Sequence, residues 1–353
     1  MKVASVVGTR PQFVKAAALS PEIRRRAEEV LIHTGQHYDE EMSRVFFDAL
    51  HIPEPNYDLG IGSGSHGEQT GRMLAAVEEI LEKEKPDSVL VYGDTNSTLA
   101  GALAAAKLHI PVGHIEAGLR SHNRSMPEEI NRIMVDHIST LLFAPTRIAV
   151  ENLKREGVEK GVHLVGDVMY DLAMRFASSS KSRETLRAMG LESKSYLLTT
   201  VHRAGNTDDR NNLEAIVEAL KECGRPVVFP IHPRTAKAIR AARISFQRSG
   251  DNVMRIKPVD YPTFISLLTG AEKVVTDSGG VQKEAYFFGI PCITLRDETE
   301  WPETVEAGWN ILVGARKRAI LKAIREFEPK GKPAMAFGDG HAAERIAKIV
   351  VGE

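Results

Sequence analysis

Cysteine is nearly absent from this chain, since Cys223 and Cys292 are the only two in 353 residues. Two cysteines are too few for a disulfide framework or a zinc site. Each lies in or beside an apolar segment, which is typical of buried, unreactive thiols. We therefore expect a protein of the reducing cytoplasm that holds no metal.

The chain also lacks an excess of either charge and lacks a long apolar run. Its 46 basic and 47 acidic residues give a formal net charge of −1, so we expect no nucleic-acid partner and no anionic membrane partner. No apolar run is long enough to span a bilayer. The first residues, MKVASVVGTRPQ, have no long apolar centre and no small-residue cleavage site. They predict a strand and a turn, not a signal peptide.

What the chain does have is a series of short, β-branched apolar runs that end in polar and glycine residues. Examples are VASVVGTRPQ (3–12), VLVYGDTNST (89–98), VGHIEAGLRS (112–121) and KVVTDSGGVQKE (273–284). Such runs are typical of buried parallel strands, and open α/β sheets bind ligands at the carboxyl ends of their strands. Because charged side chains collect at these ends, the pattern indicates an enzyme.

The length of the chain and its alternating strands and helices predict two domains. Residues 1–167 and 168–338 each carry such an alternating set, and a serine-rich stretch at 177–184 marks a change of composition. We expect an α/β protein with two doubly wound, Rossmann-like domains that face each other across a cleft. A last helix within 339–353 can cross back to the first domain.

The segment DSGGVQKE predicts a phosphate site. Ser278, Gly279 and Gly280 open a helix, where free backbone N–H groups and the helix dipole favour an anion. Glu284 is placed to accept hydrogen bonds from ribose hydroxyls. The alternative is an ordinary tight turn with Asp277 or Ser278 as the N-cap. The pattern is neither GxGxxG nor a P-loop, so neither a nicotinamide cofactor nor ATP is expected.

A second anion signal lies in GTRPQFVK (8–15). Arg10 and Lys15 fall near the start of a helix, where cations oppose the helix dipole. A bound anion would explain both residues. The alternative is that Arg10 donates to nearby carbonyl groups.

Three carboxylates follow strands in the first half of the chain. Asp94 ends a strand, where a plain helix cap is the alternative role. Glu116 interrupts an apolar strand, so either Arg120 or another cation pairs with it, or its surroundings tune it for proton transfer. Glu128 shares a helix face with Arg132, and a solvated ion pair is the alternative there. Together the three carboxylates suit acid–base chemistry.

Two histidines end strands in the second half. His202 is followed by Arg203, and an imidazolium at this position would neutralise a leaving phosphate. His232 is followed by Pro233, and a structural role is an equal alternative for it.

The chain carries an ordered set of short motifs over nearly its whole length: GTRPQFVK, TGQHYD, GDTNSTLAGALAA, HIEAGLRS, PEEINR, FAPT, HR, DSGGVQKE and RDETEWPE. In combination they resemble the non-hydrolysing UDP-N-acetylglucosamine 2-epimerases. The resemblance implies a GT-B fold, a UDP-sugar substrate, no cofactor and a homodimer. It also implies reversible conversion of UDP-N-acetylglucosamine to UDP-N-acetylmannosamine. In that mechanism UDP is eliminated to leave a bound 2-acetamidoglucal, and it adds back after reprotonation of carbon 2 from the other face.

Motif matching then implies the site residues. The implied catalytic residues are Asp94, Glu116, Glu128 and His202, with the acid and base roles of the carboxylates left open. The residues implied to bind the UDP-sugar are Arg10, Lys15, Arg132, His232, Val259, Phe264, Ser278, Gly279, Gly280 and Glu284. Phe264, in the segment KPVDYPTF (257–264), is implied to stack on uracil.

One motif departs from the family pattern. Bacterial members typically carry Thr-Glu-Arg-Pro-Glu where this chain has Thr299-Glu300-Trp301-Pro302-Glu303. Trp301 therefore replaces an arginine associated with the active site, which leaves an archaeal-like subgroup or an altered substrate open. The alternative functions are an epimerase of a related UDP-2-acetamido sugar, a hydrolysing 2-epimerase, a GT-B glycosyltransferase and a non-catalytic UDP-sugar sensor.

Overall fold

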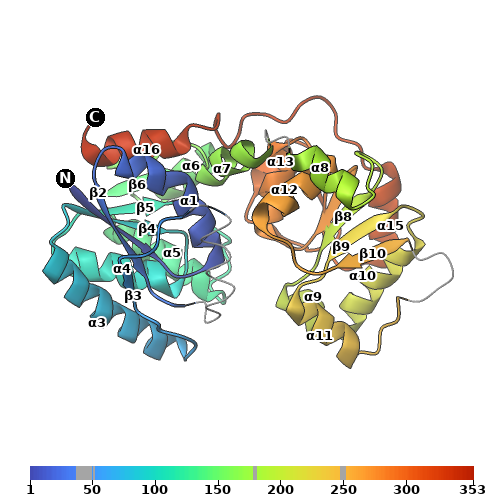
Figure 1. Ribbon diagram of the computed structural model, residues 1–353, viewed down its shortest axis with the longest axis horizontal. Coiled ribbons are helices and arrows are strands. Elements are labelled where there is room, and N and C mark those ends of the chain that lie inside the picture. Colours follow the sequence, from blue (N-terminus) through green and yellow to red (C-terminus); the bar gives the residue numbers. More distant parts are fainter. Residues whose placement is uncertain (37–49, 51, 178–180, 247–251) are drawn as a thin grey trace. The chain divides into compact units, whose positions relative to one another are not determined.

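The chain forms two compact units. The computed structural model describes residues 1–36, 50, 52–177, 181–246 and 252–353. The first unit comprises Met1–Met174 and Met335–Glu353, and the second comprises Arg175–Ala334. Each unit has a parallel sheet flanked by helices, as Figure 1 shows.

The sheet of the first unit has seven strands in the described part of the chain, in the order β3-β2-β1-β4-β5-β6-β7. They are β1 (Lys2–Val7), β2 (Glu28–His33), β3 (Tyr57–Asp58), β4 (Ser88–Tyr92), β5 (Val112–Ile115), β6 (Leu141–Ala144) and β7 (Val162–Leu164). All neighbours are parallel; Val6 pairs with Val91, and Val91 pairs with His114. The turns that follow β1, β4 and β5 therefore lie side by side at one edge of the sheet.

Helices cover both faces of this sheet (Figure 1). On one face α3, α4 and α5 pack side by side, and their residues Val77, Ala102 and Val135 join strand residues in one buried cluster. On the other face α1 packs against the strands, with α16 beside it. The helices of this unit are α1 (Arg10–Arg24), α3 (His66–Glu84), α4 (Asn96–Lys107), α5 (Pro127–Ile138), α6 (Arg147–Arg155), α7 (Val168–Ala177) and α16 (Ala342–Val351).

The second unit repeats this architecture. Its described strands run in the order β10-β9-β8-β11-β12-β13, all parallel. They are β8 (Leu197–Thr200), β9 (Val227–Pro230), β10 (Val253–Ile256), β11 (Lys273–Thr276), β12 (Cys292–Thr294) and β13 (Asn310–Leu312). The helices are α8 (Lys181–Ala188), α9 (Ala204–Thr207), α10 (Arg210–Glu222), α11 (Pro233–Ala241), α12 (Tyr261–Gly270), α13 (Gly279–Phe287), α14 (Pro302–Glu306) and α15 (Lys317–Glu326).

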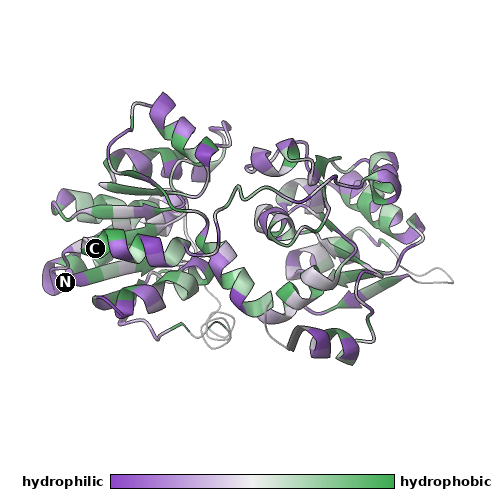
Figure 2. Cartoon of the chain, turned by 90° about the horizontal axis from the view of Figure 1, so that it is seen from above, coloured by the Kyte–Doolittle hydropathy of each residue, from purple (hydrophilic) through white to green (hydrophobic). Residues whose placement is uncertain are grey.

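Two hydrophobic clusters fill the second unit, one on each face of its sheet. Residues of α10 and α15, such as Ile216 and Ile320, pack on one face. Residues of α8 and α12, such as Leu186 and Leu267, pack on the other. Figure 2, coloured by hydropathy, shows hydrophobic strands inside and hydrophilic residues on the outer helix faces.

The boundary between the units differs from the expected one after residue 167. Helix α7 belongs to the first unit as far as Met174. Two hydrogen bonds tie it to the C-terminal segment: Asp167 N donates to Phe337 O (2.9 Å), and Ala343 N donates to a carboxylate oxygen of Asp171 (2.7 Å). Residues 335–338, expected in the second domain, therefore lie in the first unit together with α16.

In the part of the chain that the structure describes, no helix is both long enough and apolar enough to cross a membrane.

Candidate functional site

The predicted site residues lie at the carboxyl ends of strands in both units. In the first unit they follow β1, β4 and β5, and in the second they follow β8, β9, β10 and β11. Arg10 is the first residue of α1, but its side chain lies outside the described part of the structure, as do His37, Tyr38 and Asp39 of the TGQHYD motif.

A buried glutamine joins the turns after β1 and β4. The side-chain oxygen of Gln12 accepts from Gly8 N (2.7 Å) and Thr9 N (3.0 Å). Its amide nitrogen donates to Tyr92 O (2.7 Å) and to Thr98 Oγ1 (2.9 Å). Because one side chain binds both turns, it fixes the spacing between the GTRP and GDTN segments.

Glu116 pairs with Lys15, not with Arg120. The Lys15 ammonium contacts the Glu116 carboxylate, and the two side chains are only 7% and 10% exposed. Glu116 has φ +73, a conformation that costs energy for any residue with a β-carbon. Gly93 makes room for the pair, since a β-carbon there would lie 3.1 Å from Lys15 Nζ. The predicted anion-binding lysine is thus already bonded to a predicted acid–base group.

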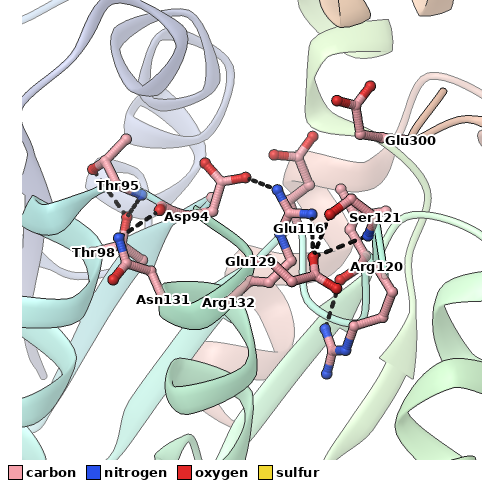
Figure 3. Close-up of polar contacts among 12 residues, drawn as sticks. Asp94, Thr95, Thr98, Glu116, Arg120, Ser121, Glu129, Asn131, Arg132 and Glu300 are labelled. Atoms are coloured by element: carbon pink, nitrogen blue, oxygen red, sulfur yellow. Dashed lines mark hydrogen bonds and ion pairs between the residues drawn. The ribbon is translucent and has the colours of Figure 1, made fainter. Parts of the chain in front are cut away.

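Asp94 pairs with Arg132, as Figure 3 shows. Arg132 also donates to Glu129 (2.8 Å), whose carboxylate is 1% exposed. Burial alone would raise the pKa of Glu129, but hydrogen bonds from Ser121 and the charge of Arg132 outweigh it and lower the pKa. Asp94 is therefore not a helix cap; Thr95 holds the N-cap position of α4.

The alternative ion pair between Glu128 and Arg132 is not formed. Arg132 turns toward Asp94 and Glu129 and is buried, whereas Glu128 is exposed on the first turn of α5. Of the three predicted acid–base carboxylates, two are thus held by cations and the third faces solvent within its unit.

In the second unit, Asp277 shapes the turn that carries His202. Its fully buried carboxylate accepts from His202 N (3.0 Å), from Arg203 N (3.0 Å) and from Asn206 Nδ2 (3.1 Å). Buried carboxylate oxygens need such donors to replace the hydrogen bonds that water would otherwise supply. Asp277 therefore links the end of β11 to the turn after β8 and does not cap α13.

His202 and His232 lie near each other, with ring centroids 5.6 Å apart. Burial lowers the pKa of His202, while the charge of Asp277 opposes the shift. His232 holds the N-cap position of α11, where its Nδ1 accepts from Arg234 N (3.2 Å). That contact is a structural one, and the role of His232 in binding the UDP-sugar stays a prediction.

The predicted diphosphate turn lies at the N-terminus of α13. Ser278 occupies the N-cap position without a side-chain cap bond, and the helix begins at Gly279. A β-carbon at Gly279 would lie 3.2 Å from a carboxylate oxygen of Glu300 and 3.5 Å from Trp301 Nε1. Glycine therefore lets the TEWPE segment approach this helix end. Glu284 is buried in the same helix.

Trp301 is buried and packs against a lysine of α13. The Lys283 ammonium lies 4.1 Å from the Trp301 ring centroid, and both residues are almost completely buried. A cation over an aromatic face is attracted to the ring. Beside them Glu300 makes two hydrogen bonds with Arg296 (2.9 and 3.0 Å).

The segment implied to bind uracil flanks the start of α12. Asp260 caps this helix by accepting from Thr263 N (2.8 Å). Val259 and Phe264 are half-buried and pack against the hydrophobic cluster of α8 and α12. Part of each side chain remains accessible in this unit, as a stacking role requires.

The protein-family model described as UDP-N-acetylglucosamine 2-epimerase matches residues 21–351 of the chain. The chain belongs to the UDP-N-acetylglucosamine 2-epimerase family. It is 54% identical over 354 residues to a UDP-N-acetylglucosamine 2-epimerase homolog of Methanococcus maripaludis, with 99% of each chain covered. It is 50% identical over 361 residues to the UDP-2,3-diacetamido-2,3-dideoxy-D-glucuronate 2-epimerase of Pseudomonas aeruginosa, again with 99% of each covered.

The crystal structure of Methanocaldococcus jannaschii UDP-GlcNAc 2-epimerase in complex with UDP-GlcNAc and UDP is similar throughout. It matches with a TM-score of 0.90 and 44% identity, and all of both chains is covered. The expected fold, two Rossmann-like domains of the GT-B class, is thereby confirmed.

Three polar residues that position turns of this protein were not predicted from the sequence. Gln12 and Asp277 each bind backbone N–H groups of a turn that carries predicted site residues, and Glu129 binds those of Ser121 and His122 in the loop after Glu116. Asp277 was expected only as a possible helix cap, and no role was expected for Gln12 or Glu129. A signal existed, because a polar residue inside a helix pattern must find a buried partner if it faces the core. Among the described residues no group of three or more His, Cys, Asp or Glu could hold a metal ion.

Proposed function

We propose that this protein converts UDP-N-acetylglucosamine to UDP-N-acetylmannosamine reversibly and without hydrolysis. UDP leaves carbon 1, a bound 2-acetamidoglucal remains, and UDP adds back after carbon 2 is reprotonated from the opposite face. The family supports epimerase activity, and the Methanocaldococcus jannaschii relative has been solved with UDP-GlcNAc and UDP.

One observation carries the proposal most strongly. Asp94 and Glu116, at the ends of neighbouring strands, each contact a buried cation, Arg132 and Lys15. A nearby cation favours the ionised form of a carboxylate, and an ionised carboxylate is the form that can remove a proton. Glu128, which is exposed in its unit, completes the set.

The chemistry requires these groups. The proton on carbon 2 is weakly acidic, but departure of UDP from carbon 1 creates positive character next to it and makes deprotonation feasible. One group must then take the proton and another must deliver one to the other face. Backbone N–H groups at the start of α13 and the side chains of Arg10 and His202 are proposed to stabilise the departing diphosphate.

Incubation with UDP-N-acetylglucosamine in deuterium oxide, followed by proton NMR, tests the proposal. We expect deuterium at carbon 2 of both UDP-sugars and no free N-acetylmannosamine. Free sugar would indicate a hydrolysing enzyme, and a product formed only with an added acceptor would indicate a glycosyltransferase. Binding of the UDP-sugar without deuterium at carbon 2 would indicate a sensor.

A second candidate substrate is UDP-2,3-diacetamido-2,3-dideoxy-D-glucuronate. The observation in its favour is the 50% identity to the Pseudomonas aeruginosa enzyme named for that sugar, against 44% to the Methanocaldococcus jannaschii structure. The same proton transfers at carbon 2 would serve both sugars. A comparison of kcat/KM for the two UDP-sugars on one preparation decides between them.

A further inference from the structure

One buried histidine contacts the turn that carries Asp94 and is linked through Asp136 to the turn that carries Glu116. His114 lies on β5, and its side chain is completely buried. Its Nε2 is 2.7 Å from Gly93 O, directly before Asp94. Its Nδ1 is 2.7 Å from Asp136 Oδ1 on α5. The two ring nitrogens thus join the turn after β4 to helix α5.

Both partners of the ring accept hydrogen bonds. A carbonyl oxygen has no proton to donate, and neither has an ionised carboxylate. Burial alone would raise the pKa of Asp136, but the His114 and Arg120 charges and hydrogen bonds hold it below its ordinary value. The two contacts therefore fit a ring that donates from both nitrogens, from Nε2 to Gly93 O and from Nδ1 to Asp136 Oδ1.

Charged groups of both signs surround this ring. Asp136 accepts from Arg120 Nη1 (2.7 Å), and Arg120 donates to both carboxylate oxygens of Glu156 (2.7 Å each). Arg120, in the turn after β5, therefore lies between Asp136 on α5 and Glu156 at the end of α6.

Through Asp136, this hydrogen-bond network also reaches the turn that carries Glu116. Asp136 Oδ2 accepts from Gly118 N (3.1 Å), two residues after Glu116. At the other end Asn131 Nδ2, also on α5, donates to Asp94 O (3.0 Å). The backbone on either side of Asp94 and the backbone just after Glu116 are therefore fixed by β5 and α5 together.

We propose that His114 is a positioning residue that sets the Asp94 and Glu116 turns at the same time, through its two ring N–H groups. This inference rests on the proposed function. Buried ion pairs are a poor way to gain stability, because desolvation offsets most of their attraction. Such pairs do fix the orientation of the side chains, since each donor must point at its acceptor. A site that must hold two carboxylates for proton transfer needs fixed orientations of this kind.

Two variants test the contacts of the two ring nitrogens of His114 separately. His114→Gln places an amide near the position of Nε2 and keeps the bond to Gly93, whereas His114→Asn keeps the bond to Asp136. We expect kcat for deuterium exchange to fall at least about tenfold in each, because one carboxylate turn is released in each case. KM and the affinity for UDP should change less than about twofold, because the proposed UDP-binding residues lie mainly in the second unit. His163→Gln is the control, since His163 lies on β7, two strands from β5, and its ring stacks on Phe143.

Nitrogen-15 NMR of histidine-labelled wild-type protein tests the charge without any activity or variant. We expect two protonated ring nitrogens for His114 at pH 8, with the signals assigned by their loss in His114→Asn. One unprotonated ring nitrogen would overturn the two-donor arrangement. Either variant exchanging deuterium at the wild-type rate would also overturn the proposal. Wild-type protein that exchanges no deuterium would instead reject the proposed function, and the NMR result would stand by itself.

Discussion

Lys15 and Glu116, which lie 101 residues apart in the sequence, form a buried ion pair between α1 and the end of β5. The pair joins a residue expected to bind an anion to one expected to move a proton. A buried carboxylate that loses its cation is costly and tends to take up a proton. Lys15 is therefore inferred to keep Glu116 ionised.

Lys15→Met tests that inference. The variant should exchange deuterium at least about tenfold more slowly near neutral pH, and the acid limb of its pH profile should move to higher pH. Thermal melting and the exchange rate are measured on the same preparation. The matched control is Lys107→Met at the exposed end of α4, which should behave as wild type. An unshifted acid limb in Lys15→Met would contradict the inferred role.

Asp277→Asn should loosen the turn that carries His202. The carboxylate accepts from two backbone N–H groups and the Asn206 amide, and an amide in its place presents only one oxygen. We expect the free energy of unfolding to drop by about 1–3 kcal/mol and the affinity for UDP to weaken. Chemical denaturation and calorimetry measure the two effects. The control is Asp297→Asn, because Asp297 is 76% exposed and pairs with exposed Arg316.

The pH dependence of stability should contain a contribution from His202. Its pKa is lowered from 6.5 mainly by burial, so the unfolded chain takes up this proton at a higher pH than the folded chain does. The contribution is absent above pH 6.5 or so, and the free energy of unfolding falls as the pH drops toward the folded pKa. The difference between wild type and His202→Asn, measured from pH 8 to pH 5, isolates this effect from the other histidines.

Trp301→Arg should destabilise the second unit. The new guanidinium would face the buried Lys283 ammonium, which now lies over the indole ring, and like charges in a buried site repel strongly. Trp301→Phe keeps an aromatic face and should cost much less. Thermal melting of the two variants gives the comparison. Equal melting temperatures would show that the contact between Lys283 and the ring contributes nothing.

The sequence was sufficient for the fold and for most of the strand ends, because parallel strands leave short apolar runs and polar turns at fixed places. The sequence did not predict which residues the charged side chains bond to. Glu128 and Arg132 have ideal helix spacing, yet Arg132 bonds to Asp94, 38 residues earlier in the chain. Local spacing predicts local pairs only, whereas sheet order decides which turns meet. The unit boundary lies after Met174 and not after residue 167 for a similar reason, since Ala343, far along the chain, bonds to Asp171 of α7.

Trp301 illustrates the same limit. The motif showed that an arginine was replaced but not what the tryptophan contacts, since Lys283 lies on a different element. The homodimer and the cytoplasmic location stay predictions, the first from family resemblance and the second from the cysteine content.

The central claim is that Asp94, Glu116 and Glu128 transfer protons. Asp94→Asn, Glu116→Gln and Glu128→Gln each keep the shape of the side chain and remove its basic group. Loss of an acid–base group typically slows a reaction by about a hundredfold or more. UDP should still bind to all three variants, because the turn at Ser278 to Gly280 lies in the other unit. The exposed Glu128 should tolerate the change with little effect on the melting temperature.

The most direct test is the rate of deuterium incorporation at carbon 2 of UDP-N-acetylglucosamine, measured by proton NMR for wild type and the three amide variants. The account predicts exchange by the wild type and a loss of at least about a hundredfold in each folded variant. Exchange at the wild-type rate in all three variants would contradict the assignment of proton transfer to Asp94, Glu116 and Glu128.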